Sequence, residues 1–157
     1  MVEPVLIGRL FDAHAPALVL YARQLCDDPE AAVQQAFMKL AEQSHAPKEP
    51  TAWLFRTTRN EALMAVRAAR RRRRRETEAA QNRSQWFRSA DAQKIDAHTV
   101  ARAMASLPSD QREIVAAHIW GGLSFQSIGE VVGISSSAAH RRYQSALATL
   151  RKGIGEP

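Results

Sequence analysis

Six consecutive arginines, Arg70 to Arg75, are the strongest chemical feature of this 157-residue chain. Residues 51–90 carry 11 basic and 3 acidic side chains, whereas residues 1–50 are net acidic. The basic character is therefore local. Six adjacent cations repel one another, and a polyanion would remove this repulsion and release its own counterions. The run thus favours a nucleic-acid partner, although a solvated helix face, a tail or a sorting signal is the alternative interpretation.

A second pattern, from about Leu123 to Leu150, predicts a helix-turn-helix. Gly129 is small where two helices would cross closely, and Gly133 suits a left-handed turn. Ser135 would cap the following helix, whose free N–H groups can meet a phosphate. The residues of that helix expected to contact phosphates and base edges are Ser135, Ser136, Ser137, His140, Arg141, Arg142 and Gln144. A plain helical hairpin is the alternative.

The elements that must position these groups are all helical by pattern. Glycine is scarce before residue 121, and no segment alternates apolar and polar residues as a half-buried strand does. The expected helices cover about 5–26, 29–46, 50–75, 97–106, 108–120, 124–132 and 135–150. Pro16 is expected to kink or split the first helix. Val33, Phe37 and Trp53 are expected to pack in a core.

Several classes of protein are excluded by composition. The single cysteine, Cys26, excludes a disulfide framework, and its default interpretation is a buried structural thiol. The five histidines are scattered without ligand spacing, so no metal site and no cofactor are expected. No pattern of paired carboxylates, Gly-rich phosphate loop or nucleophilic triad is present, so no enzyme is expected. No long apolar run is present and the start lacks basic residues, so a cytoplasmic protein without a membrane partner is expected.

Taken together, these segments resemble a small sigma factor of the extracytoplasmic-function type, in the sigma-70 family. Residues 28–40 resemble the family's core-binding helix, and residues 51–63 followed by Arg67 resemble its minus-ten helix. Leu107-Pro108, residues 122–125 and residues 133–135 resemble its region 4. The resemblance implies an all-α chain of two small domains: region 2 at 1–76, a linker at 77–96, and the region 4 helix-turn-helix at 97–157.

The resemblance also implies partners and roles. Such a protein directs core RNA polymerase to specific promoter DNA and assists melting of the minus-ten element, and an anti-sigma protein often inhibits it. Residues that would contact polymerase are Glu30, Gln34, Gln35 and Met38. Residues that would bind the minus-ten region are Arg56, Arg59, Asn60, Arg67, Arg70, Arg71 and Arg72. Arg59 or Arg67 could instead be a surface charge, and Trp53 a base-stacking residue rather than core.

The sequence departs from the family pattern in its core-binding helix. The family usually carries acids near positions 31 and 35, where this chain has Ala31 and Gln35. Loss of these charges would weaken contact with polymerase. A stand-alone helix-turn-helix regulator without polymerase binding is therefore an alternative function. A sigma-like decoy that sequesters a regulator and an RNA-binding role for the arginine run are further alternatives.

Overall fold

The computed structural model describes residues 1–76 and 95–155, and within these ranges the chain forms helices and no strands. The helices are α1 (Pro4–Arg23), α2 (Pro29–Ala41), α3 (Pro50–Glu76), α4 (Ile95–Ala105), α5 (Ser109–Val115), η2 (Ala116–Trp120), α6 (Phe125–Val132) and α7 (Ser136–Gly155). The predicted all-α fold is confirmed. The predicted linker at 77–96 lies almost wholly outside the described residues.

Helix α1 differs from its expected form in two ways. It runs unbroken through Pro16, and it ends at Arg23, so Cys26 lies beyond its end. A proline inside a helix removes one backbone hydrogen bond, and the packing of the flanking turns must offset that cost. Leu18 and Tyr21 supply the packing, because both side chains are fully buried. Cys26 is half-buried rather than buried, which corrects its expected place in the core.

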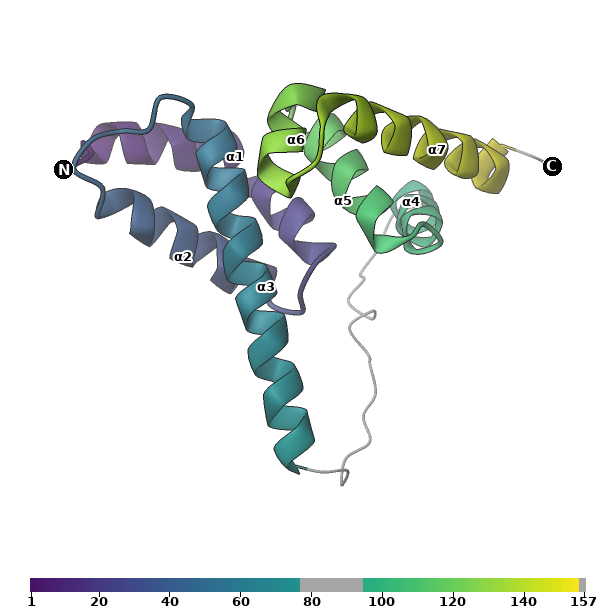
Figure 1. The fold of residues 1–157 in the computed structure, drawn as a ribbon, viewed down its shortest axis with the longest axis horizontal. Helices are drawn as coiled ribbons and strands as arrows, with labels where there is room; N and C mark the ends of the chain where they lie inside the picture. The colour runs from purple at the N-terminus through teal and green to yellow at the C-terminus, as the bar shows by residue number, and fades with distance from the viewer. Residues whose placement is uncertain (77–94, 156–157) are drawn as a thin grey trace.

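Helices α2 and α3 complete a bundle with α1. Asp28 caps α2 by accepting a hydrogen bond from the Ala31 amide at 3.2 Å. Val33 and Phe37 are buried as predicted, and Trp53 packs half-buried against the same core. Helix α3 then continues past the bundle for several turns and ends at Glu76, as Figure 1 shows. The arginine run occupies this projecting end.

The second half of the chain departs from prediction at one helix. The expected single helix from Pro108 to Gly121 consists of α5 followed by the π-helical turn η2. The Gly121 amide donates to the carbonyl of Ala116 at 3.2 Å, five residues back. A Cβ atom on Gly121 would lie 2.6 Å from the ring of Phe55 on α3. The wide turn therefore ends at a glycine that lies directly against the ring of Phe55.

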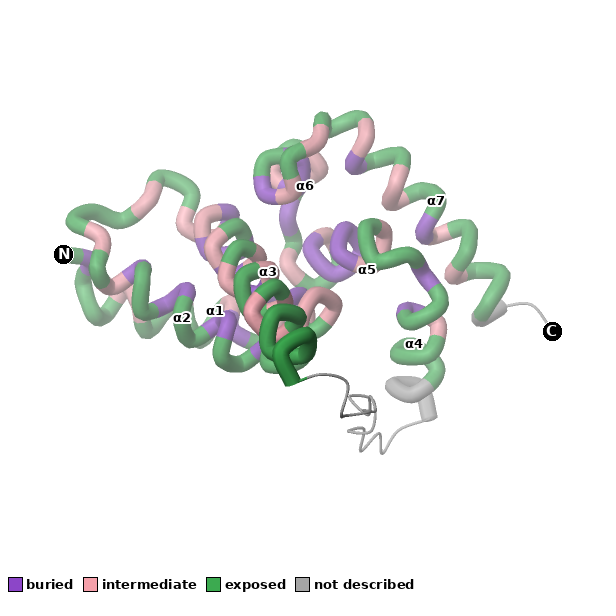
Figure 2. Tube along the Cα trace, turned by 60° about the horizontal axis from the view of Figure 1, so that its bottom comes forward, coloured by how far each residue is buried: buried purple, intermediate pink, exposed green. Residues whose placement is uncertain are grey.

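The two halves share one hydrophobic core. Helix α6 packs against α3, and η2 packs against α1. Leu18 and Phe55 from the first half lie in one buried cluster with Ile114, Leu123 and Ile128 from the second. Figure 2 shows buried segments of both halves turned toward each other. A smaller cluster, containing Met104, Leu107, Val115 and Ala146, joins α4, α5 and α7. The two sigma-like regions are thus docked, an arrangement that the sequence did not predict.

Among the described residues, α1 is the one helix long and apolar enough to cross a membrane by length and composition. A core helix passes the same test, because its apolar residues pack in the protein interior. Leu18, Tyr21 and Ala22 on α1 are fully buried against protein. These residues pack α1 against α2 and α3, whereas Val5 and Phe11 of the same helix are exposed.

Candidate nucleic-acid interface

The helix-turn-helix predicted near the C-terminus is confirmed in its local geometry. Ser124 caps α6 by accepting a hydrogen bond from the Ser127 amide at 3.1 Å. Gly133 ends α6 in the left-handed region with φ of 90°. A Cβ atom on Gly129 would lie 2.5 Å from the carbonyl oxygen of Ile134, so only glycine allows this close approach. These contacts fix the angle at which α7 leaves the turn.

Helix α7 presents the polar face expected of a recognition helix. Ser135 caps α7 by accepting a hydrogen bond from the Ala138 amide at 3.0 Å. Ala139 of the same helix is buried in the core. The predicted contact residues that are exposed are Ser135, Ser136, Ser137, His140, Arg141 and Gln144. Arg142 is the exception. It is half-buried, with a guanidinium nitrogen 3.7 Å from a carboxylate oxygen of Asp110.

An aromatic cluster beneath this face was missed by the sequence reasoning. The ring of Phe125 stacks on His118 with 4.4 Å between centroids and meets His140 edge-on at 5.0 Å. Tyr143 packs against the same Phe125 ring at 5.2 Å. His118 is held in turn by a 2.9 Å contact between Nδ1 and the carbonyl oxygen of Leu123. The cluster positions His140 on the exposed face of α7. Helical spacing of His140 and Tyr143 could have suggested part of it.

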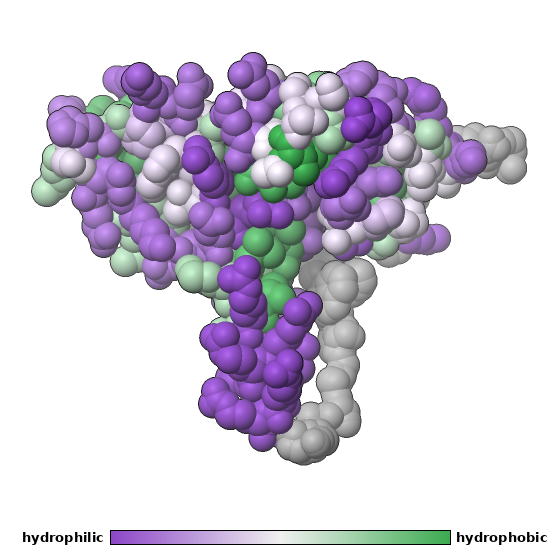
Figure 3. All heavy atoms as spheres, in the orientation of Figure 1, coloured by the Kyte–Doolittle hydropathy of each residue, from purple (hydrophilic) through white to green (hydrophobic). Residues whose placement is uncertain are grey.

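Most of the predicted minus-ten residues form a stripe along α3. Arg56, Asn60 and Arg67 are exposed, and at about 100° per residue they lie within about 40° of one another around the axis. Arg70 and Arg71 extend the stripe, whereas Arg72 is turned about 160° away from Arg56. Figure 3 shows a continuous hydrophilic surface over the projecting end of α3.

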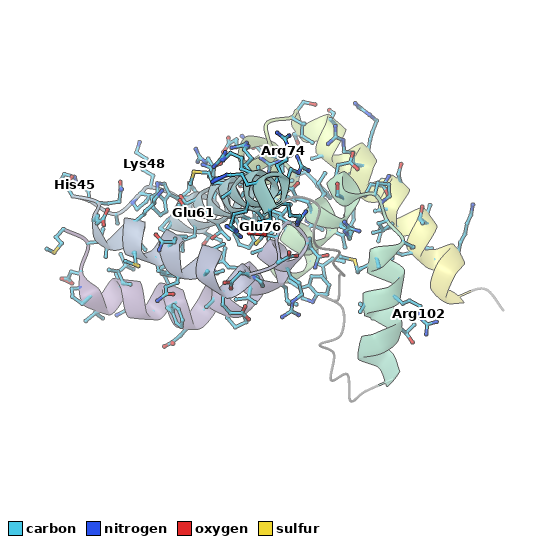
Figure 4. The ribbon with its side chains drawn as sticks, turned by 90° about the horizontal axis from the view of Figure 1, so that it is seen from below. His45, Lys48, Glu61, Arg74, Glu76 and Arg102 are labelled. Atoms are coloured by element: carbon cyan, nitrogen blue, oxygen red, sulfur yellow. The ribbon has the colours of Figure 1, made fainter. Side chains whose placement is uncertain are left out.

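Arg74 belongs to the same stripe and was not among the predicted site residues. It lies about five turns after Arg56, which returns it to the same side of the helix. Figure 4, seen from below, shows Arg74 projecting from the near end of α3, away from α1. Counting residues along the predicted helix would have found it.

Arg59 is the predicted minus-ten residue that the structure places elsewhere. Its Nε donates a hydrogen bond to Oε2 of Glu113 on α5, and the hydroxyl of Tyr21 on α1 donates to the same oxygen at 2.6 Å. Burial raises the pKa of Tyr21 well above its usual range, and the charge of Glu113 raises it further. In this arrangement the guanidinium of Arg59 is bound within the protein.

The predicted polymerase-binding residues share one exposed face of α2. Glu30, Gln34, Gln35 and Met38 are all exposed, while the opposite side of the helix is buried. Gln35 and Ala31 also line a groove that runs between α2 and α3, along with Cys26, Met64 and Arg70. Partial burial in this groove raises the pKa of the Cys26 thiol. The groove joins the predicted polymerase-binding face to the start of the arginine run.

Both halves of the chain match models of known families. Residues 10–72 match sigma-70 region 2, and residues 97–150 match sigma-70 region 4. The extracytoplasmic-function RNA polymerase sigma factor SigL of Mycobacterium tuberculosis is 26% identical over 162 aligned residues, which cover 98% of this chain and 92% of that protein.

Solved structures with a similar fold include the sigma factor RpoE of Bartonella quintana, crystallised in complex with the anti-sigma factor NepR. It has a TM-score of 0.75 and 22% identity, and the match covers 98% of this chain and all of that one. CnrH, in complex with the cytosolic domain of CnrY, has a TM-score of 0.63 and 25% identity, with 94% of this chain and 86% of that chain covered. With both regions matched in order along the chain, the protein belongs to the sigma-70 family as a sigma factor of the extracytoplasmic-function type.

Proposed function

We propose that this sigma factor reads the minus-thirty-five element with α7 and the minus-ten element with α3, while α2 contacts core RNA polymerase. The observation that carries the proposal is the agreement of two exposed faces with two family regions: the polar face of α7 in region 4, and the basic stripe of α3 in region 2. Directing polymerase to promoters is the activity of this family. The assignment of its parts to particular residues is the proposal.

For the minus-thirty-five element, the exposed residues of α7 divide into two groups. Ser135, Ser136 and Ser137 lie at the N-terminal end of the helix, where short hydroxyl side chains and free amides suit phosphate contacts. His140, Arg141 and Gln144 lie one turn further on, where longer side chains reach base edges. Arg142 is expected to contribute less, because Asp110 already pairs with it.

For the minus-ten element, Arg56, Asn60 and Arg67 would line the nontemplate strand, with Arg70, Arg71 and Arg72 bound to duplex phosphates upstream. Extruding a base costs a few kcal/mol, which phosphate pairing along the strand must offset. The loop at 44–50 would lie beside the extruded base. Arg59 joins this set only after it leaves Glu113.

For polymerase, the exposed face of α2 supplies Glu30, Gln34, Gln35 and Met38. This face carries fewer charges than the family pattern, so shape and amide hydrogen bonds would account for more of the affinity. We further propose domain boundaries at 1–76 and 97–157, with 77–96 as the linker, as the units that separate during promoter binding.

The remaining parts of the proposal follow from the family. Sigma factors initiate transcription without catalytic chemistry of their own, and we infer the same for this chain, with no cofactor and a cytoplasmic location. Because RpoE was crystallised in complex with the anti-sigma factor NepR, we also infer an anti-sigma partner here. The stand-alone regulator is not favoured, since such a regulator has no use for a complete region 2.

The test is capture of bacterial core RNA polymerase with the purified chain, followed by run-off transcription from a randomised promoter library. We expect binding and specific initiation, with enrichment of one paired minus-thirty-five and minus-ten sequence. The variant Gln35→Glu, which restores an acid usual in the family, should bind polymerase more tightly. The matched control Asp12→Asn changes the charge of an exposed residue of α1, outside α2 and the proposed face. A folded chain that binds promoter DNA but no polymerase would contradict the proposal.

A further inference from the structure

Two side chains on the exposed face of α7 are hydrogen-bonded to each other. Nε2 of the Gln144 amide lies 3.3 Å from Nε2 of His140, four residues earlier in the same helix. An amide nitrogen can only donate, so the ring nitrogen of His140 accepts. The neutral ring therefore carries its proton on Nδ1, and that N–H is its one hydrogen-bond donor. We name the two residues the His140–Gln144 pair.

The bond within the pair sets what Gln144 can offer to a base. It uses one of the two amide hydrogens, which leaves one N–H donor beside the acceptor Oε1. Adenine is the complement of this arrangement, because it presents the N7 acceptor and the N6 donor in the major groove. Guanine presents two acceptors there and would need both amide hydrogens. The bond to His140 thus gives Gln144 a preference for adenine over guanine.

The same bond determines what His140 can offer. Its Nδ1–H is a single donor, and both purines present the N7 acceptor in the major groove, whereas cytosine presents an amino donor. Residues four apart on a helix are about 6 Å apart along its axis, and successive bases of a strand are about 3.4 Å apart. Because the two side chains are also in contact, the bases that they reach are neighbours. His140 is thus suited to a purine next to the adenine.

Contacts from two other elements fix the orientation of the His140 ring. Phe125 of α6 meets it edge-on, with 5.0 Å between centroids and 78° between the ring planes. His118 of η2 stacks on Phe125 at 4.4 Å and 18°. The carbonyl oxygen of Leu123 holds His118 through Nδ1 at 2.9 Å. The ring that would meet DNA is therefore supported by the π-helical turn through one intervening ring.

This support matters because His140 and Gln144 are exposed, while Phe125 and His118 are half-buried. An exposed side chain that is ordered only on binding loses rotamer freedom at that moment, and this loss weakens binding. A ring already held in one orientation avoids the loss and also fixes the direction of its N–H. Phe125 and His118 can therefore influence base recognition without touching DNA.

We infer that the His140–Gln144 pair reads an adenine and a neighbouring purine of the minus-thirty-five element as one unit, with Phe125 and His118 as positioning residues. This inference rests on the proposed function, because it places α7 in the major groove of that element. It makes a distinctive claim about Gln144. Loss of the His140 ring frees the second amide hydrogen, so the preference for adenine over guanine falls although Gln144 itself is unchanged.

The experiment uses the full-length chain bound to core polymerase and promoter duplexes enriched from the randomised library. Each base pair of the minus-thirty-five element is replaced in turn, and adenines are also replaced by 7-deazaadenine, which lacks the N7 acceptor. Dissociation constants are measured for His140→Ala, Gln144→Ala, the double variant and Phe125→Leu. The control for Phe125→Leu is Phe11→Leu, because Phe11 on α1 also meets another ring edge-on, at 5.1 Å.

For the unmodified chain we expect a loss of about tenfold when one adenine is replaced by guanine or by 7-deazaadenine. Gln144→Ala should abolish this discrimination. His140→Ala should lower it about threefold or more, and the double variant should lose no more at that base than Gln144→Ala. Phe125→Leu should lower it about twofold or more, whereas Phe125→Tyr, which keeps the ring, and Phe11→Leu should not change it.

Outcomes at the pair separate base reading from simpler contacts. A His140→Ala chain that binds every promoter more weakly by the same factor has lost a phosphate contact, which overturns the inference. An unchanged preference for adenine over guanine in His140→Ala also overturns it, and both results leave the proposed function intact. If the chain binds no core polymerase, the proposed function fails, and the same titrations with duplexes selected by the chain alone decide on the pair.

The positioning role has its own outcomes. Circular dichroism and urea unfolding show whether Phe125→Leu is folded. If it is not, His118→Ala takes its place, because it removes the ring stacked on Phe125 and leaves Phe125 present. We expect His118→Ala to lower the adenine preference in the same direction. A folded Phe125→Leu or His118→Ala chain with an unchanged adenine preference overturns the positioning role.

Discussion

The two proposed DNA-binding faces differ in the contacts that position their side chains. On α7, six of the seven predicted residues are exposed, and the caps and glycines that orient the helix lie within a few residues of it. On α3, the predicted minus-ten residues are exposed except Arg59, which Glu113 holds from 54 positions away in the chain. Region 4 carries a face organised by local chemistry. The face of region 2 depends on where region 4 lies.

The largest expected effect tests whether local contacts at the turn orient α7. Gly129→Val would place a Cβ atom 2.5 Å from the backbone carbonyl oxygen of Ile134, which cannot move without opening the turn. We expect the free energy of unfolding of region 4 to fall by about 3 kcal/mol. Binding to a minus-thirty-five duplex should be lost, while binding of the minus-ten single strand is kept. Urea unfolding and fluorescence anisotropy measure both.

The matched control is Gly153→Ala, because a Cβ atom there meets nothing within 4 Å. This substitution should leave stability unchanged or raise it slightly, since alanine favours a helix over glycine. Equal losses at positions 129 and 153 would show that the close approach at the turn does not orient α7.

These local features explain why region 4 was predictable. Ser124, Gly133 and Ser135 act on amides within four residues, so their types and spacing carry the geometry. The cap of α2 at Asp28 was predictable for the same reason. The pattern of helices in both halves follows from apolar spacing, which a sequence displays directly.

The docked arrangement was not predictable by this route. Nothing near Glu113 in the sequence marks it as buried, since an acid beside Arg112 is an ordinary exposed pair in a helix. Its burial depends on Tyr21 and Arg59, which reach it only after the whole chain has folded. The π-helical turn at η2 belongs to the same interface and carries no local signal that helix propensities describe.

The next effect sharpens the comparison within α7. Arg141→Ala should weaken promoter binding by about 1–3 kcal/mol and relax specificity at one base position, because the side chain is free to read a base edge. Arg142→Ala should cost less, because Asp110 already pairs with its guanidinium and must release it to DNA. Anisotropy titrations against promoter duplexes with each base substituted measure both. A larger loss for Arg142 would reverse the proposed assignment of the two arginines.

A pH dependence tests the contact between the two regions at Tyr21, Glu113 and Arg59. Burial raises the pKa of Tyr21 in the folded chain well above its usual 10, the charge of Glu113 raises it further, and Arg59 opposes the shift. A raised folded pKa means that the stabilising contribution is complete below about pH 10 and is lost progressively as the pH rises from there through the folded pKa. Tyr21→Phe should therefore flatten the alkaline decline in the free energy of unfolding.

The decline removed by Tyr21→Phe should be at most about 1.4 kcal/mol per pH unit, which is the limit for one proton. Urea unfolding between pH 8 and 11 measures it. Tyr143→Phe removes the hydroxyl of the chain's other tyrosine, which takes no part in the hydrogen bonds of Glu113, and should keep the decline. An unchanged alkaline decline in Tyr21→Phe would mean that the tyrosine proton is not held by the docked state.

The smallest expected effect concerns single phosphate contacts along α3. Each neutralised phosphate adds about one unit to the slope of log affinity against log salt concentration. Arg74 lies on the stripe defined by Arg56 and Arg67, whereas Arg72 is turned about 160° from Arg56. Arg74→Gln should therefore lower the slope by about one unit, and Arg72→Gln by less. Polymerase-bound promoter titrations at several salt concentrations measure the difference. Equal slopes for the two variants would mean that DNA wraps around the end of α3 and contacts both sides of the helix, rather than following one stripe.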